Sequence, residues 1–170
     1  ISTRIRFVRN INGLKFNLKT KEEIEKLDEK IRDNLYNIGY GLNFFKLKDM
    51  DNTTKLSLVE KNLISPDFII DNHLTGGILI NDDENICITT GQEDHLKIQV
   101  FNSGIDLENT LNLAIEIDKK LEEILGYCIN KKYGYLTSCP SDLGTGLRAS
   151  VMVHLPALAI TKNVNQLLDA

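Results

Sequence analysis

Four cations occur in three segments where polar and apolar residues alternate. Arg4 and Arg6 lie in the first segment, Lys97 lies in residues 96–101, and Arg148 lies in residues 147–155. Side chains along a strand point to alternate faces, so each segment predicts a strand with an apolar face and a cation-bearing polar face. If the strands share a sheet, the cations converge and suit a polyphosphate, because arginine holds phosphate oxygens with a planar fork. Ordinary solvent-facing arginines on half-exposed strands explain the same alternation.

A second group of reactive side chains stands directly before the strand of Lys97. By alternation, Glu93 and His95 are expected on the same face as Lys97, and Asp94 adds a second carboxylate. A carboxylate beside a cation cluster is a candidate general base, whereas an acidic turn is the simpler interpretation. Cys139 lies near a glycine-rich segment, as either a reactive thiolate beside cations or a small buried hydrophobic residue. The pattern leaves these alternatives open.

The remaining reactive residues do not indicate a metal site or a disulfide. His73 and His154 have no partner at metal-ligand spacing, and the three cysteines lack a CxxC pair. Scattered free cysteines are typical of a reducing compartment, so we predict free thiols, no metal held by protein ligands, and a cytoplasmic location. The Gly-Thr-Gly run at 144–146 resembles a phosphate-cradling loop but lacks the Lys-Ser/Thr of a P-loop.

The elements expected to position these residues are strands interrupted by a few helices. A capping-box spacing at Thr20 and Glu23 predicts a helix that ends near Gly39 or Gly41. A second helix is predicted from Asp106 to a glycine cap at Gly126, and a third after residue 156. Residues 55–63 fit either a helix or a strand. Strands are predicted at 3–8, 42–47, 77–80, 86–89, 96–101 and 147–155. This order predicts an α+β fold with a mostly antiparallel sheet flanked by helices.

Composition places the chain among ordinary globular domains. Its 170 residues are 42% hydrophobic and 26% charged, which excludes a fibrous or disordered chain. The net charge of −4 disfavours a broad nucleic acid-binding surface, and the apolar runs are too short for a spanning helix. The sequence shows no secretory signal. Both ends look cut, so we expect residues 1–170 to be part of a longer polypeptide.

Several segments together resemble the phosphagen (ATP:guanido) kinase family, and in particular its bacterial protein-arginine kinase branch. They follow the family's order along nearly the whole chain, and residues 135–157 are the most specific part. The similar segments are Ser2-Thr-Arg-Ile-Arg6, Arg9-Asn10, Glu60-Lys-Asn-Leu-Ile-Ser-Pro66, Glu93-Asp-His95, Tyr135-Leu-Thr-Ser-Cys-Pro140, Gly144-Thr-Gly-Leu-Arg-Ala-Ser-Val151 and His154-Leu-Pro-Ala157. The resemblance implies a guanido kinase/glutamine synthetase-like catalytic domain, with residues 1–170 as its N-terminal part and the remainder beyond residue 170.

The resemblance also implies an activity and a set of site residues. The activity is transfer of the γ-phosphoryl of ATP to arginine side chains of proteins, with Mg²⁺ coordinated mainly by nucleotide phosphates and water. Glu93 matches the carboxylate that orients and deprotonates the guanidinium, and Cys139 matches the cysteine beside that group. The positions that match nucleotide-binding residues are Ser2, Thr3, Arg4, Ile5, Arg6, Asn62, Lys97, Arg148, Ala149, Ser150, Val151 and Met152.

Four positions depart from the family pattern. Lys97 replaces an arginine, Asn62 a histidine, Gln92 a usually acidic residue and Asp142 an asparagine. A segment with an Arg-Gly-x-Tyr-Gly-Glu motif, which carries a second guanidinium-contacting glutamate in the family, is expected beyond residue 170. Two alternatives stay open. One is a small-molecule guanidino kinase such as an arginine kinase. The other, which Lys97, Asn62 and the segment expected beyond residue 170 motivate, is a catalytically impaired regulatory homologue that binds nucleotide.

Expected partners follow from the resemblance alone. They are protein substrates with exposed arginines and, by family analogy, Clp-type protease machinery and stress regulators. A homodimer is expected as well. Direct nucleic-acid binding and membrane association are not expected.

Overall fold

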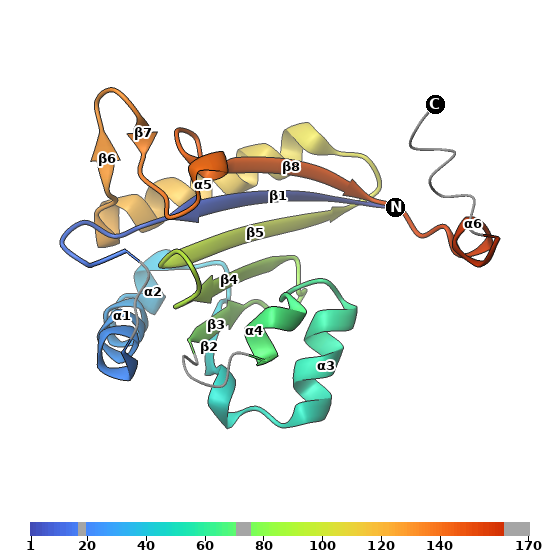
Figure 1. The fold of residues 1–170 in the computed structure, drawn as a ribbon, viewed down its shortest axis with the longest axis horizontal. Coiled ribbons are helices and arrows are strands. Elements are labelled where there is room, and N and C mark those ends of the chain that lie inside the picture. Colours follow the sequence, from blue (N-terminus) through green and yellow to red (C-terminus); the bar gives the residue numbers. More distant parts are fainter. Residues whose placement is uncertain (17–19, 71–75, 162–170) are drawn as a thin grey trace.

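The computed structural model describes residues 1–16, 20–70 and 76–161. At its centre lies a six-stranded antiparallel sheet in the order β2-β3-β4-β5-β1-β8 (Figure 1). This confirms the expected α+β class with an antiparallel sheet. The strands are β1 (Ser2–Arg9), β2 (Asn43–Lys46), β3 (Gly77–Ile80), β4 (Ile86–Thr90), β5 (Leu96–Ser103) and β8 (Leu147–Met152), and β6 (Ile129–Asn130) and β7 (Gly134–Tyr135) form a separate hairpin.

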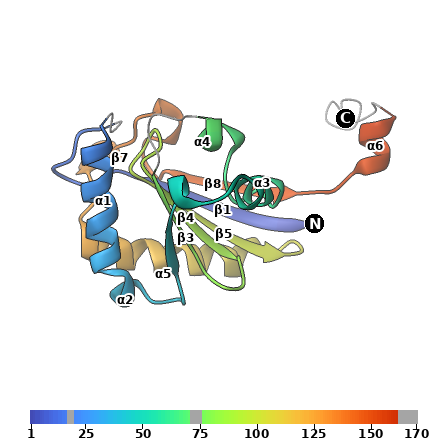
Figure 2. The same cartoon turned by 90° about the horizontal axis from the view of Figure 1, so that it is seen from below.

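Helices cover both faces of this sheet (Figure 2). On one face α1 and α5 pack against the buried side chains of β1, β4 and β5, including Ile5, Ile88 and Ile98. On the other face a smaller cluster joins α3 and α4 to β3 and β4 through Leu58, Phe68 and others. The helices are α1 (Lys21–Asp33), α2 (Leu35–Ile38), α3 (Asn52–Glu60), α4 (Pro66–Ile70), α5 (Leu107–Leu125) and α6 (Pro156–Ile160), with 3₁₀ turns at Leu47–Asp49 and Pro140–Asp142.

Local sequence signals account for where the two long helices begin. The Thr20 hydroxyl accepts a hydrogen bond from the Glu23 amide, and the Glu23 carboxylate accepts one from the Thr20 backbone N–H, as the capping-box spacing predicts. Asp106 caps α5 in a similar way, and Gly126 follows its last turn with φ of 71°. Both predicted helix starts are therefore confirmed, and so is the glycine cap.

Other boundaries differ from the prediction for identifiable reasons. Helix α1 ends at Asp33, where the Asn34 side-chain amide donates to the Lys30 carbonyl. The short helix α2 then continues to Ile38, directly before Gly39 with φ of 77°, so the helical segment ends at the predicted glycine but is broken at Asn34. Strand β8 ends at Met152 rather than at residue 155, since its partner β1 begins at Ser2, directly opposite. The ambiguous segment 55–63 forms the end of helix α3 and the turn after it. His73 and residues 162–170 of the predicted last helix lie outside the described residues.

The sheet order brings together the three strands that carry cations. Strand β1 lies between β5 and β8, with Arg6 opposite Gln99 on one side and Arg148 on the other. Arg4 pairs with Ser150 of β8. The assumption that the three strands share one sheet is confirmed.

Candidate active site

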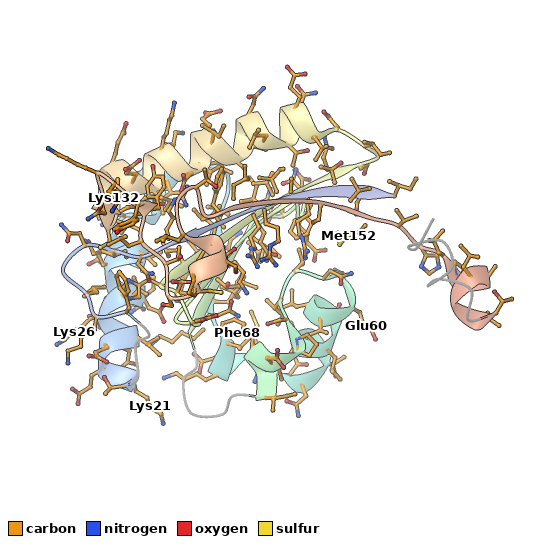
Figure 3. All side chains as sticks on the ribbon, turned by 45° about the horizontal axis from the view of Figure 1, so that its top comes forward. Lys21, Lys26, Glu60, Phe68, Lys132 and Met152 are labelled. Atoms are coloured by element: carbon orange, nitrogen blue, oxygen red, sulfur yellow. The ribbon has the colours of Figure 1, made fainter. Side chains whose placement is uncertain are left out.

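The cations of β1, β5 and β8 lie on the sheet face that α3 and α4 also pack against. Figure 3 shows Glu60 of α3, Phe68 of α4 and Met152 at the end of β8. The Arg4 guanidinium donates from Nε to the Ser150 hydroxyl at 3.1 Å. Burial lowers the pKa of Arg4, and the charges of Arg6 and Arg148 lower it further. Burial also lowers the pKa of Lys97, with Arg6 and Arg4 adding repulsion. These shifts show that positive charge is concentrated at a partly desolvated place, which favours an anion.

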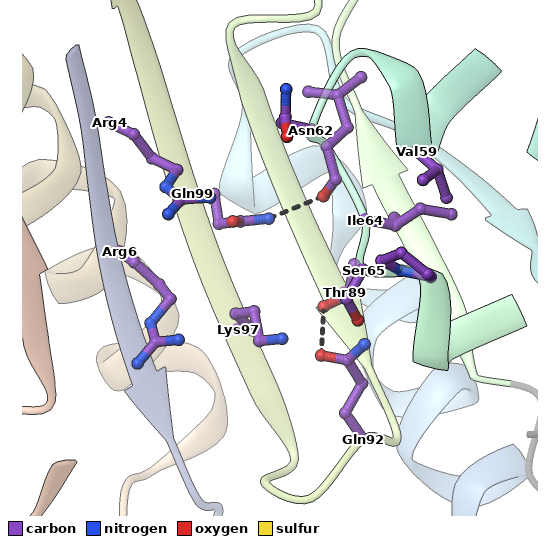
Figure 4. A pocket seen from close by; sticks show the side chains of 12 residues that line it. Arg4, Arg6, Val59, Asn62, Ile64, Ser65, Thr89, Gln92, Lys97 and Gln99 are labelled. Carbon is purple, nitrogen blue, oxygen red and sulfur yellow. Dashed lines mark hydrogen bonds between the residues drawn. The ribbon is translucent and has the colours of Figure 1, made fainter. Parts of the chain in front are cut away.

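A cavity of about 320 Å³ lies against these cations. Arg4 and Arg6 line it from β1 and Lys97 from β5, while Asn62 lines it from the turn after α3 (Figure 4). Gln99 is fixed in its wall because its amide donates to the Leu63 carbonyl at 2.8 Å. Part of this wall is therefore held in place by contacts within the protein.

One donor in this wall has no partner among the described residues. The Nε atom of Arg6 is buried and unpaired, although Nη2 of the same guanidinium contacts both carboxylate oxygens of Asp142 at 2.9 and 3.1 Å. Buried polar groups in native proteins nearly always have a hydrogen-bond partner. The unpaired Nε is therefore a donor that is available to an acceptor atom of a ligand or to water.

Two further cavities adjoin the first, and the three form a series. A cavity of about 490 Å³ shares Leu63 with it and is lined by Ser2, Phe101 and Met152. A small cavity of about 90 Å³ on the other side shares Arg6, Gln92 and Lys97 with it and is also lined by Glu93, Asp94 and Asp142. The largest cavity is also lined by the charged residues Lys61, Asp83 and Glu84. The series therefore runs from a mixed apolar and charged space, through a cationic one, to a small space where carboxylates lie beside Arg6 and Lys97.

The loops that carry Glu93 and Cys139 are joined by a buried carboxylate. Asp94 accepts from the Asn10 side-chain amide at 2.6 Å and from the Ser138 backbone amide at 2.7 Å. The Ser138 hydroxyl donates to the backbone carbonyl of Glu93 at 2.8 Å. The Glu93 side chain itself is exposed, and the Cys139 sulfur lies 3.0 Å from the Ser141 hydroxyl oxygen. Asp94 and Asn10 were not among the predicted site residues, and the Arg9-Asn10 pair after the first strand was the signal for this link.

His95 does not share the face of Lys97, so that expectation is wrong. Its ring is fully buried, where Nδ1 accepts from the Ile11 amide at 2.9 Å and Nε2 lies 2.7 Å from the Lys15 carbonyl oxygen. The alternation fails because β5 begins only at Leu96, after a turn that redirects the chain. Burial lowers the pKa of His95, and the ring serves as a neutral link between loops.

Four of the predicted nucleotide-binding positions have side chains that point away from the cations. Thr3 and Ile5 are buried in the opposite face of the sheet, and Thr3 donates from its hydroxyl to the Gly104 carbonyl. Ala149 and Val151 stand opposite Ile5 and Thr3 on β8 and so share that face. On this face the β1 side chains are buried, but the β8 side chains are exposed. Within the described residues, the prediction that the apolar face of β8 packs into the core is therefore wrong.

The glycine-rich segment at 144–146 is anchored by a buried arginine. Arg9 donates from Nη1 to the carbonyls of Val8 and Thr145, each at 2.8 Å, and its Nη2 pairs with Asp118 of α5 at 2.7 Å. The Arg9 guanidinium also lies over the ring of Tyr135, 3.7 Å from its centroid. This network positions the segment that leads into β8 and Arg148.

The described residues contain no cluster of potential metal ligands, and their cysteines are free thiols. No group of three His, Cys, Asp or Glu side chains able to hold a metal occurs in that part of the chain. All three cysteines are free, and burial raises the pKa of Cys87 to about 12. His154 is exposed. Within the described ranges, the helices fall short of the length and apolar character that crossing a membrane requires.

Comparison with solved structures defines the class of fold. The chain superimposes on the duplicated taurocyamine kinase of Schistosoma mansoni with bound transition-state analogue components, at a TM-score of 0.81 and 29% identity, covering 94% of this chain and 24% of that one. A lombricine kinase structure matches with a TM-score of 0.71 and 25% identity, over 93% of this chain and 48% of that one. The fold is that of a guanidino kinase catalytic domain.

The sequence comparison then identifies the family. Residues 23–170 match the family described as "ATP:guanido phosphotransferase, C-terminal catalytic domain", and the chain belongs to this family. Protein-arginine kinases of Halalkalibacterium halodurans and Clostridium acetobutylicum are 43% and 40% identical to it over its full length. The chain covers 49% and 51% of those proteins, so it spans about half the length of these relatives.

Proposed function

We propose that this chain forms the nucleotide-binding part of an enzyme that transfers the γ-phosphoryl of MgATP to arginine side chains of proteins. The series of three cavities carries the proposal, with the unpaired Nε of Arg6 at its centre. The family description supports ATP and a guanidino acceptor. The relatives named protein-arginine kinase support an acceptor arginine within a protein.

In this proposal the nucleotide lies across the two larger cavities. Arg4, Arg6 and Lys97 neutralise the phosphates, and the base occupies the cavity lined by Phe101 and Met152. Phosphoryl transfer depends on alignment and on neutralising spread negative charge more than on covalent chemistry. Because the described residues offer no cluster of metal ligands, Mg²⁺ would be coordinated by the phosphates and water.

The small cavity at the end of the series holds the acceptor. Glu93 orients the guanidinium there and accepts the proton that its nitrogen loses as the N–P bond forms and the bond from the γ-phosphorus to the ADP oxygen breaks. The lone pairs of a guanidinium are delocalised, so a positioned carboxylate is needed to make it a nucleophile. Cys139 acts by electrostatic positioning rather than by attack, and Asp94 holds the two loops together.

The test is a phosphorylation assay with the complete gene product, MgATP and a protein substrate, read as phosphoarginine by mass spectrometry after neutral work-up. Glu93→Gln is expected to lower kcat by roughly 10²- to 10⁴-fold, the usual contribution of a general base, with little change in nucleotide affinity. Glu123→Gln, an exposed position on α5, removes the same charge and is expected to leave kcat unchanged.

Two results would replace this proposal with an alternative. Transfer to free arginine but not to protein-bound arginine identifies a small-molecule guanidino kinase. Nucleotide binding without transfer to either acceptor identifies a regulatory homologue, for which the replacement of the family arginine by Lys97 is the supporting observation. The Clp-type partners, the stress regulators, the homodimer and the cytoplasmic location stay predictions.

A further inference from the structure

Asp142 places a negative charge inside the cation cluster. Its carboxylate accepts two hydrogen bonds from Nη2 of Arg6 and lies 3.5 Å from Nη2 of Arg148. The Asp142 and Arg6 side chains are only 11% and 17% exposed, so water screens their attraction poorly. Two of the four cations proposed to bind phosphate are therefore already paired within the protein.

The position of this pair relates it to one end of the nucleotide. Arg6 lines both the cationic cavity and the small carboxylate cavity, and Asp142 lines only the latter of these two. In any in-line transfer, the phosphate nearest the acceptor is the terminal one. The Arg6–Asp142 pair stands at the boundary between the two cavities, where the terminal phosphate of ATP would lie. The inner phosphates and the base lie farther along the series.

We infer that Asp142 competes with the terminal phosphate of ATP for Arg6 and Arg148, and so determines how strongly the site discriminates ATP from ADP. This inference rests on the proposed function. A carboxylate and a phosphate present similar acceptor oxygens to a guanidinium fork. Binding of the terminal phosphate must either displace the carboxylate or place two like charges side by side, whereas ADP avoids both costs.

The same carboxylate has the opposite effect when the site is empty. Arg6 and Arg148 stand directly opposite each other on neighbouring strands, and like charges in that position repel. Asp142 offsets this repulsion and holds both guanidinium groups in place. Removing its charge should therefore destabilise the nucleotide-free protein while strengthening binding of a triphosphate. A purely structural residue would not produce this pair of opposite effects.

Calorimetry on the complete gene product tests the inference with MgADP and the non-hydrolysable analogue Mg-AMP-PNP. For Asp142→Asn, which keeps the shape of the side chain, we expect the Kd of AMP-PNP to fall by about tenfold or more, a change of ~1.4 kcal/mol. The Kd of ADP should change by less than about threefold, and the thermal midpoint without nucleotide should fall. Asp83→Asn is the charge-matched control, because Asp83 lines the cavity of Phe101, and it should leave the AMP-PNP/ADP affinity ratio unchanged.

Asp142→Ser also removes the charge, so we expect the same tighter binding of AMP-PNP and the same lower thermal midpoint. This variant is used if Asp142→Asn does not fold. The unaltered protein provides a measurement that needs no variant: it should bind AMP-PNP at most about tenfold more tightly than ADP. A preference above 100-fold overturns the inference, and so does an unchanged affinity ratio in the neutral variants. A raised KM for the arginine acceptor with unchanged nucleotide affinities also overturns it. If the unaltered protein binds neither nucleotide, the proposed function itself fails.

Discussion

Asp118→Asn is a test of whether burial or distance decides the strength of an ion pair in this protein. Asp118 faces the Arg9 guanidinium with contacts of 3.0 Å to Nε and 2.7 Å to Nη2. The two side chains are 8% and 2% exposed. The exposed pair Lys61–Glu84 has a shorter contact of 2.6 Å, but its side chains are 48% and 42% exposed. Distance alone predicts that the exposed pair is the stronger one.

Burial predicts the reverse order. Removing one partner of a buried pair leaves an uncompensated charge and costs about 3–5 kcal/mol. Arg9 keeps two carbonyl acceptors and the Tyr135 ring after Asp118→Asn, so we expect the lower end, about 3 kcal/mol. Glu84→Gln should cost less than about 1 kcal/mol, as surface pairs do. A typical domain has only about 5–15 kcal/mol of stability, so the first change should be conspicuous.

Urea unfolding followed by circular dichroism measures both variants, since urea adds no salt that would screen the charges. With a slope of about 2 kcal/mol per molar urea, Asp118→Asn should lower the midpoint by about 1.5 M and Glu84→Gln by less than about 0.5 M. Equal shifts for the two variants would refute the argument that burial controls the cost. A double variant that adds Arg9→Met should recover part of the loss, because no unpaired charge then remains buried.

Two further predictions concern the loops around the site. Stability should fall as pH drops below about 6.5, the ordinary pKa of histidine, because the lowered pKa of His95 means that the unfolded chain binds the proton first. His95→Gln should flatten this part of the pH–stability curve, and an unchanged curve would contradict the assignment. Gly146→Ala should lower the urea midpoint and nucleotide affinity together, because φ is +59° and a Cβ would lie 2.6 Å from the Val8 carbonyl oxygen. Gly104→Ala is the control, because Gly104 has φ of +75° but open space around it. Its loss of stability measures backbone strain alone, and any additional loss in Gly146→Ala comes from the clash with Val8.

Structural features that depend on residues close together in the sequence could be predicted from the sequence. The alternation around Arg4 and Arg6 gave the correct faces of β1, and the Thr20 and Asp106 caps gave the correct helix starts. The local pattern left the use of the cations open, and the family resemblance supplied the expected activity. The glycine signal at Gly39 gave the end of the helical segment, whereas the break at Asn34 between α1 and α2 was not predicted.

Contacts between distant segments were decided only by the tertiary structure. Asp142 meets Arg6 across 136 positions of sequence, and Asp94 meets the Ser138 amide across 44. Such pairs depend on the order and register of strands, and a local pattern carries no information about which strand lies beside which. The sequence by itself determined that the chain carries four cations on predicted strands, with a carboxylate directly before one of those strands. The tertiary structure decided that three of the cations line a series of adjoining cavities, and that Asp142 pairs with Arg6 where two of these cavities meet. Alternation and capping depend on a few adjacent residues, so the sequence predicts them. The order of the strands depends on many weak contacts between distant segments, so only the tertiary structure shows it.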